Sequence, residues 1–260
     1  MDPRHTTAFT VHLHHIGPNG LARPSLRFEC FQSAASEHSA RLGFSIRALM
    51  GRGLTWVASR YRVKVCRYPR WQKRIRMTTW RSPQQSHTAA REFTIVDADN
   101  RTTALARGIF NLLDRSTNRP VSPTHQTPGY PTAGETVFAD EFKALPAVAS
   151  PDRPTRIHIR REDLDVNRHL DFAVKSVPEP IMGSHMPDLI KISFFKSAGY
   201  GDTIQSLIQQ HPVHGDQLEF IHQLVGEPEP LEYCRLSTRW KRMSSPPTIA
   251  ALFAPAQVWC

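Results

Sequence analysis

Residues 25–42 read SLRFECFQSAASEHSARL, and four segments of different character follow: TWVASRYRVKV at 55–65, KRIRMTTW at 73–80, TAAREFTIVDA at 88–98 and TTALARGIFNLLD at 102–114. The first segment predicts a helix, because its face-forming groups recur at helical spacing: Phe31, Ala34, Ala35, His38 and Leu42. Ser25 is expected to cap its start and Gly43 its end. The later segments are rich in β-branched and aromatic residues, which predicts strands. The order is therefore a helix followed by a sheet.

Turn signals separate the predicted strands. They are YPRW at 68–71, RSPQQS at 81–86 and DADN at 97–100, and residues 45–50 before the first strand predict a short second helix. Such turns favour antiparallel hairpins between consecutive strands.

A proline-rich stretch divides the chain. Seven prolines lie between Pro120 and Pro154, where neither a sheet nor a helix interior is expected. The same order then returns, with a strand at 156–166, a helix from Leu170 that Pro178 and Pro180 cut short, and four more strands at 188–197, 202–210, 217–225 and 231–241. The predicted division is an N-terminal domain at 1–119, a linker at 120–154, a C-terminal domain at 155–243 and a tail at 244–260.

The repeated order defines the expected fold class. A helix wrapped by an antiparallel sheet is the plan of the hotdog fold, and here it occurs twice. We therefore expect an α+β protein of two tandem hotdog domains that share one continuous sheet.

Charge is unevenly distributed along the chain. The net charge is +10, with 20 Lys and Arg against 7 Asp and Glu in residues 1–130, and 13 against 16 in residues 131–260. The N-terminal half is therefore expected to meet an acidic partner, which charge alone leaves open as nucleic acid, an anionic membrane or an acidic protein. No apolar signal core and no stretch approaching the ~18 apolar residues of a membrane span is apparent, so a soluble, cytoplasmic protein is expected.

The four cysteines carry no recognisable framework. Cys30, Cys66, Cys234 and Cys260 form no CxxC pair and have no histidine at zinc-finger spacing. We expect neither a metal site nor a disulfide framework, and interpret these thiols as buried or idle.

The stretch REDLDVNRHL at 161–170 is the most informative for chemistry. On a strand, alternate side chains share a face, so Asp163, Asp165, Asn167 and His169 would line up on one side. From this window alone two interpretations stay open. One is a solvated edge strand whose Asn167 and His169 cap the next helix, and the other is a reactive site.

DLDVNRH resembles the signature of the acyl carrier protein (ACP) thioesterases of bacteria and plants. The resemblance covers roughly residues 9–242 and includes LGFSIRALMGRGLTWVASRYRVKVCRYPRW, REFTIVDADNRTTALARGIFNLLDRSTNRP, FFKSAGYGD and CRLSTRWKR. It implies a hydrolase without a cofactor that frees fatty acids from ACP, with the acyl chain in the N-terminal hotdog and the chemistry in the C-terminal one. The implied partner is ACP with a phosphopantetheine-linked fatty acyl chain.

The resemblance places Asp165, Asn167 and His169 on the catalytic motif. A histidine suits proton transfer because its ordinary pKa lies near neutrality. An asparagine amide can donate to the developing oxyanion. Asp165 would then orient one of these two residues through a hydrogen bond.

One family position departs from the pattern. Where the family carries a Glu in a strand ahead of a Gly-Asp turn, FFKSAGYGD presents Ser197, and the neighbouring cysteine of plant members is Ala198. A hydroxyl cannot act as a carboxylate base at neutral pH. The expectation is weak hydrolysis, and the alternative is a non-catalytic hotdog protein that binds ACP or an acyl thioester.

Residues 60–81 contain nine Lys and Arg and no acid. Alternation places Arg60, Arg62 and Lys64 on one strand face, and Arg74 and Arg76 on one face of the next. The set is either a solvated sheet surface or a dock for acidic ACP, and the predicted docking residues are Arg60, Arg62, Lys64, Lys73, Arg74 and Arg76. Nearby aromatic residues keep nucleic-acid binding as a minority alternative. Trp56, Phe110 and Phe194 are interpreted as core residues that could also line the acyl cavity.

Overall fold

The computed structural model describes residues 2–83, 87–139, 142–152, 154–163, 185–211 and 217–242. In chain order the elements are β1 Arg4–Thr10, η1 Leu13–His15, α1 Ser25–Arg41, α2 Ile46–Gly51, β2 Leu54–Val65, β3 Arg74–Ser82, β4 Thr88–Val96, β5 Thr102–Asp114, β6 Arg119–Val121, α3 Pro123–Gln126, β7 Thr155–His158, η2 Arg161–Asp163, β8 His185–Phe194, β9 Thr203–His211, β10 Gln217–Glu227 and β11 Glu232–Arg242. The predicted helices and long strands of the N-terminal half are confirmed to within a few residues.

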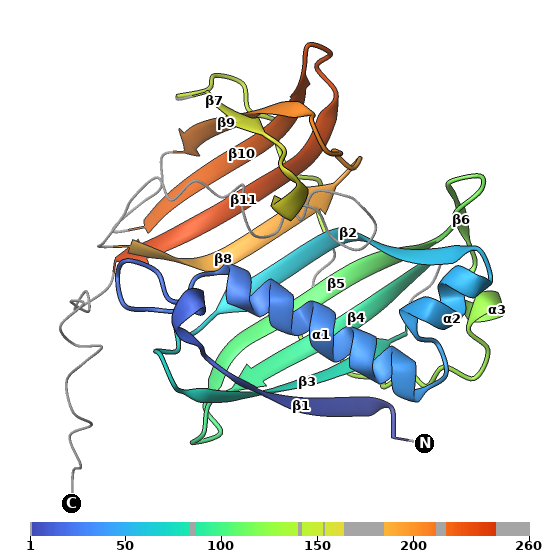
Figure 1. The fold of residues 1–260 in the computed structure, drawn as a ribbon. Helices are drawn as coiled ribbons and strands as arrows, with labels where there is room; N and C mark the ends of the chain where they lie inside the picture. The colour runs from blue at the N-terminus through green and yellow to red at the C-terminus, as the bar shows by residue number, and fades with distance from the viewer. Residues whose placement is uncertain are drawn as a thin grey trace, which may run out of the picture.

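One antiparallel sheet runs through both halves of the protein. Its strand order is β1-β3-β4-β5-β2-β8-β11-β10-β9-β7, with β6 paired to β5 (Figure 1). Outward from the junction of β2 and β8, the strand order is β2-β5-β4-β3-β1 in one half and β8-β11-β10-β9-β7 in the other. In both halves the last of these strands in the chain therefore lies second and the remaining strands follow in reverse order. The two halves are thus related as a duplication, and the expected single continuous sheet is confirmed by the pairing of Arg62 with Lys191 at this junction.

The prediction that consecutive strands pair as antiparallel hairpins is wrong for β2 and β3. β3 to β4 and β4 to β5 are antiparallel neighbours, but β2 pairs with β5 and β8, while β3 pairs with β1 and β4. The segment with YPRW at 68–71 therefore connects two strands separated by β5 and β4. This long-range connection lets the sheet curve around α1.

Helix α1 crosses the concave face of the N-terminal sheet, which we call the inner face (Figure 1). The helix begins at Ser25 after Pro24, and no side chain caps that end, so the predicted Ser25 cap is wrong. Gly43 follows the helix with φ +84°, as a helix terminator does. Phe31 and Ala34 are fully buried against the sheet, so the predicted helical face is confirmed at these positions.

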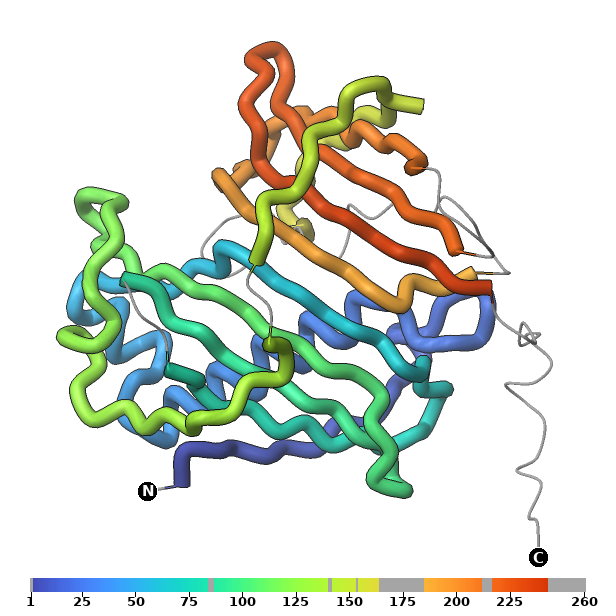
Figure 2. The backbone as a smooth tube through the Cα atoms, turned by 180° about the vertical axis from the view of Figure 1, so that it is seen from behind, coloured from blue at the N-terminus to red at the C-terminus, as the bar shows by residue number. Residues whose placement is uncertain are grey.

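The proline-rich segment crosses the opposite, outer face of the sheet (Figure 2). Arg60 donates to the backbone oxygen of Phe142 at 3.3 Å, and Arg235 donates to that of Leu145 at 2.7 Å. The segment also contains a short strand, β6, and a short helix, α3. Pro120 is tolerated in β6 because that strand is an edge strand. The boundaries of the two domains remain predictions.

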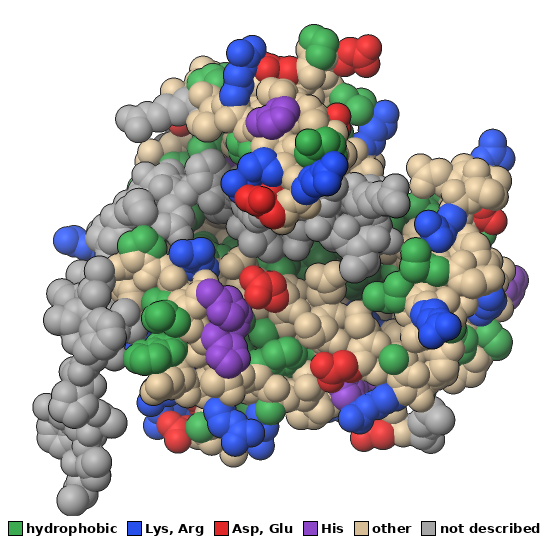
Figure 3. Space-filling view, viewed as in Figure 1, with side chains coloured by type: hydrophobic (Ala, Val, Ile, Leu, Met, Phe, Trp, Pro, Cys, Tyr) green, Lys and Arg blue, Asp and Glu red, His purple; other side chains and the backbone are tan. Residues whose placement is uncertain are grey.

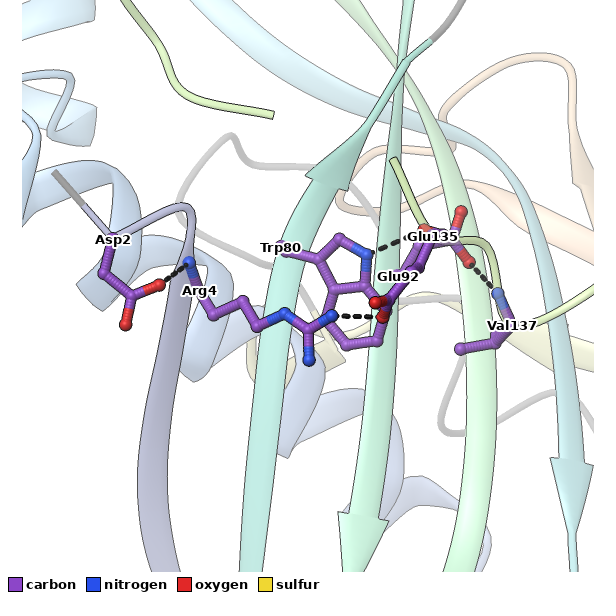
Figure 4. Close-up of polar contacts among 6 residues, drawn as sticks. All are labelled: Asp2, Arg4, Trp80, Glu92, Glu135 and Val137. Atoms are coloured by element: carbon purple, nitrogen blue, oxygen red, sulfur yellow. Dashed lines mark hydrogen bonds and ion pairs between the residues drawn. The ribbon is translucent and has the colours of Figure 1, made fainter. Parts of the chain in front are cut away.

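Polar contacts hold the middle of this segment, at residues 135–137, in place (Figure 4). The Trp80 indole donates to the backbone oxygen of Glu135 at 2.9 Å, and the Glu92 carboxylate accepts from Val137 N at 3.2 Å. Arg4 stacks over Trp80 and pairs with the Glu135 carboxylate. Burial raises the pKa of Glu92. These contacts attach the segment to β3 and β4 on the outer face.

The C-terminal half corrects the strand predicted at 156–166. β7 ends at His158, and residues 161–163 form a 3₁₀ turn instead. Asp163 is 4% exposed and accepts from Arg160 N at 2.9 Å, so it caps a turn and does not belong to an alternating strand ladder. The helix expected from Leu170 lies outside the described residues.

No helix in the described part of the chain is long and apolar enough to cross a bilayer.

Candidate active site

A cavity of about 520 Å³ lies between α1, α2 and the inner face of the N-terminal sheet. Four aromatic residues form one wall of the cavity: Phe28, Tyr61, Phe110 and Phe194. The ring centroid of Tyr61 lies 5.5 Å from that of Phe28, 5.7 Å from that of Phe110 and 6.5 Å from that of Phe194. Trp56 also lines the cavity. Trp56, Phe110 and Phe194, interpreted as core residues that could also line the cavity, are partly buried against the core and do line it.

Residues 194–197 line the cavity at the junction of the two halves, and because Phe195, Lys196 and Ser197 are exposed, we call this part of the cavity the mouth. β8 ends at Phe194, so Ser197 lies in the following loop and not in a strand as predicted. Ser197 is exposed, whereas Ala198 is fully buried. Lys196 is also exposed at the mouth, and sequence reasoning did not identify it.

The described lining residues include no Asp, Glu, His or Cys. They therefore supply hydroxyl, amide and cationic groups, but no carboxylate, imidazole or thiol. The predicted catalytic residues Asp165, Asn167 and His169 lie outside the described residues. Asp202 accepts from Gly199 N at 2.8 Å, so it acts as a turn residue. Within the described ranges no group of His, Cys, Asp and Glu is arranged to hold a metal ion.

The described cysteines do not provide a nucleophile at the cavity. Burial raises the pKa of Cys30 to about 12, and it also raises the pKa of Cys234. Cys66 is exposed and does not line the cavity, and Cys260 lies outside the described residues. The interpretation as buried or idle thiols is confirmed for Cys30 and Cys234.

Of the predicted basic residues, Arg60, Arg62, Lys64, Arg74 and Arg76 lie on the outer face of the sheet. Arg60 and Lys64 are exposed while Tyr61 and Val63 are buried, so the expected alternation of β2 is confirmed. Arg62 is half-buried, with its guanidinium 4.4 Å from the ring centroid of Phe138. Lys73 lies just before β3, and it is exposed like Arg74 and Arg76 on that strand. On the opposite face, which Figure 3 shows, Lys and Arg side chains are scattered around the rim among acidic ones.

The cavity also reaches two buried arginines that sequence reasoning missed. Arg81 on β3 and Arg91 on β4 are 9% and 7% exposed, and both line the cavity with Tyr130. The alternation of side chains along the strand could have identified Arg91. It shares a strand face with the apolar residues Phe93 and Ile95, which predicts that its side chain points inward. We call this part of the cavity, made of Arg81, Arg91 and Tyr130, the arginine end.

These features define a class: a double-hotdog protein with an apolar cavity that runs across the N-terminal sheet to the junction of its halves. Two family models match the chain, the acyl-ACP thioesterase N-terminal domain at residues 2–126 and the C-terminal domain at residues 149–242. The chain therefore belongs to the acyl-ACP thioesterase family.

Individual relatives agree with this assignment. The chain is 21% identical to the chloroplastic oleoyl-acyl carrier protein thioesterase of Coriandrum sativum, over 91% of this chain and 76% of the relative. Its fold resembles that of the 12:0-ACP thioesterase from Umbellularia californica, with a TM-score of 0.81, 19% identity, and 94% and 99% of the two chains covered. An acyl-ACP thioesterase from Bacteroides thetaiotaomicron gives a TM-score of 0.78 at 17% identity, with 92% and 98% covered. The predicted double-hotdog fold is confirmed.

Proposed function

We propose that this protein hydrolyses fatty acyl-ACP thioesters to a free fatty acid and the carrier protein. The observation that carries the proposal is the cavity of about 520 Å³, whose aromatic wall leads from the arginine end to the mouth at residues 194–197. An apolar cavity of this kind suits an alkyl chain, since burial of each methylene contributes about 0.8 kcal/mol. The family membership supports the same reaction.

The proposed chemistry belongs to Asp165, Asn167 and His169. In this proposal His169 manages the proton of the attacking water, Asn167 donates to the oxyanion, and Asp165 orients one of them. Replacing Asn167 or His169 with Ala should abolish hydrolysis while the circular dichroism spectrum stays unchanged, because one positioned acid–base group contributes about 10²–10⁴-fold. Unchanged turnover in both variants would remove these residues from the mechanism.

Ser197 bears on how fast the reaction is. Its position at the mouth of the cavity supports a place beside the thioester, and its hydroxyl cannot act as a carboxylate base. Ser197→Glu should therefore raise kcat, and adding His169→Ala to that variant should abolish the gain. The assay is free-thiol release from one acyl-ACP, and strong wild-type turnover that falls in Ser197→Glu would contradict the proposed role.

A non-catalytic acyl-binding protein is the second candidate. It is favoured by the described cavity lining, which offers no carboxylate, imidazole or thiol. Free-thiol release separates the two candidates, because a binding protein would retain acyl-ACP without releasing the carrier thiol.

ACP docking is proposed for the outer face. The proposed docking residues are Arg60, Arg62, Lys64, Arg74 and Arg76 on that face, together with Lys73 just before β3. Arg60 is paired in register with Ser193, one residue before Phe194 of the cavity lining, which supports a docking position near the junction of the two halves. Arg62 is partly covered by Phe138, which leaves Arg60, Lys64 and the β3 cations as the accessible charges. A cytoplasmic location belongs to the same proposal, and fractionation of cells that make the protein would test it.

A further inference from the structure

The arginine end places two guanidinium groups inside a cavity that is otherwise largely apolar. Arg81 and Arg91 are paired in register on β3 and β4, and the same row continues through Gly108 on β5 and Tyr61 on β2 to Ile192 on β8. Neighbouring strands lie about 4.8 Å apart, so three strand spacings separate β4 from β8, about 14 Å in all. The cavity therefore has a cationic end and, across the sheet, a mouth.

Among the described residues, the hydrogen-bond partners of these arginines are all uncharged. Arg91 contacts His38 Nδ1 at 3.2 Å and Thr79 Oγ1 at 3.3 Å, and it also donates to the Tyr130 hydroxyl. Burial, with a further contribution from Arg91, lowers the pKa of His38 to about 4, so His38 is neutral at neutral pH. Arg81 donates to Thr127 Oγ1 at 3.1 Å.

No carboxylate in the described part of the chain forms an ion pair with either guanidinium. The acid on the adjoining turn of α1 is Glu37, which pairs with His5 at 3.1 Å instead. Arg81 stacks 4.6 Å from the ring centroid of Tyr130, and its Nε is buried without a hydrogen-bond partner among the described residues. A buried charge without a counter-charge is costly, so this end of the cavity favours an anion.

Resting on the proposed function, we propose that the arginine end binds a carboxylate at the far end of the acyl chain. The favoured substrate is then an acyl thioester whose chain ends in a carboxylate instead of a methyl group. A guanidinium presents planar donors that match a carboxylate, and desolvation strengthens the pairing. The apolar wall between the two ends accommodates the intervening methylenes.

The first test compares two substrates on the wild-type protein. The two acyl-ACPs have chains of equal length, one ending in a carboxylate and one in a methyl group. We expect kcat/KM to be at least tenfold higher for the carboxylate-ended chain. Equal values, or a preference for the methyl-ended chain, would overturn the proposal. This comparison needs no variant that has to fold.

The second test measures binding without turnover. Calorimetric titration with the monomethyl ester of an α,ω-dicarboxylic acid presents one carboxylate and one uncharged ester. We expect Arg81→Met and Arg91→Met to weaken binding at least tenfold, since loss of one member of a buried charged pair is strongly unfavourable. The control Arg101→Met, at an exposed residue of the β4–β5 turn, should bind as the wild type does. Equal affinity of Arg91→Met and the wild type would refute the proposal.

The third test measures inhibition of hydrolysis by a plain fatty acid. Such an acid can enter with its own carboxylate first and act as a product bound in reverse. Arginine-dependent inhibition by the plain acid, together with equal hydrolysis of the two thioesters, would make this end a product site and overturn the proposal. Failure of the proposed function looks different: neither thioester would be hydrolysed, while titration would still depend on Arg81 and Arg91.

Discussion

The buried ring of His222 should make the protein lose stability in mild acid. His222 on β10 is fully buried, and its Nε2 lies 3.0 Å from the Thr238 hydroxyl. Burial lowers its pKa from 6.5 to about 4. The unfolded chain therefore takes up a proton near pH 6.5, whereas the folded protein resists protonation until about pH 4. The stabilisation is present above pH 6.5 and is lost as the pH falls through this window.

The size of the effect follows from that difference. One pKa unit corresponds to about 1.36 kcal/mol, so the full loss from His222 is about 3 kcal/mol, of which about 2 kcal/mol appears between pH 7 and pH 5. In His222→Gln the amide can keep the contact with Thr238 but cannot titrate. We expect the variant to lose about 2 kcal/mol less free energy of unfolding over this interval than the wild type does.

Urea unfolding at pH 7 and pH 5, followed by circular dichroism, measures this difference. His125→Gln is the matched control, because His125 is exposed on α3 and its substitution should leave the pH dependence unchanged. His38 should keep part of the dependence in the variant, since its pKa is also lowered to about 4. If the wild type and His222→Gln lost equal free energy between the two pH values, burial of this ring would not be the cause.

Two further predictions concern the cavity and the docking face. A Cβ at Gly108 would lie 2.8 Å from ring atoms of both Phe110 and Tyr61. Gly108→Ala should therefore lower the free energy of unfolding by about 1–3 kcal/mol and shift the preferred substrates to shorter acyl chains. An unchanged urea midpoint and an unchanged chain-length preference would contradict this. If Arg74 and Arg76 attract ACP, KM for acyl-ACP should rise with salt, because charges are screened beyond about 8 Å at physiological ionic strength, and Arg74→Ser with Arg76→Ser should flatten that rise. A KM that ignores salt would argue for a merely solvated surface.

Much of the fold was predictable because its elements depend on local periodicity. Alternation on β2 places Tyr61 and Val63 inside and Arg60 outside whichever strands lie beside them. The helical spacing of Phe31 and Ala34 is equally local. The family motif was readable for the same reason, although Asp165, Asn167 and His169 stay predictions.

Strand neighbours were decided only by the tertiary structure. Turn signals at 68–71 resemble a hairpin, yet β2 and β3 are separated by two strands, because pairing depends on the closure of the sheet around α1. The three-residue turn that holds Asp163 likewise follows from its contact with Arg160, and alternation does not describe it.

The arginine end shows the same division. From the sequence, alternation with Phe93 and Ile95 is enough to turn Arg91 inward. Whether a neighbouring acid neutralises it depends on segments far apart in the chain. Here the described partners from α1 and from the segment with Tyr130 are the uncharged side chains of His38 and Tyr130. Side-chain direction is a local property of a strand, whereas the electrostatic surroundings of a buried charge are set by the whole fold.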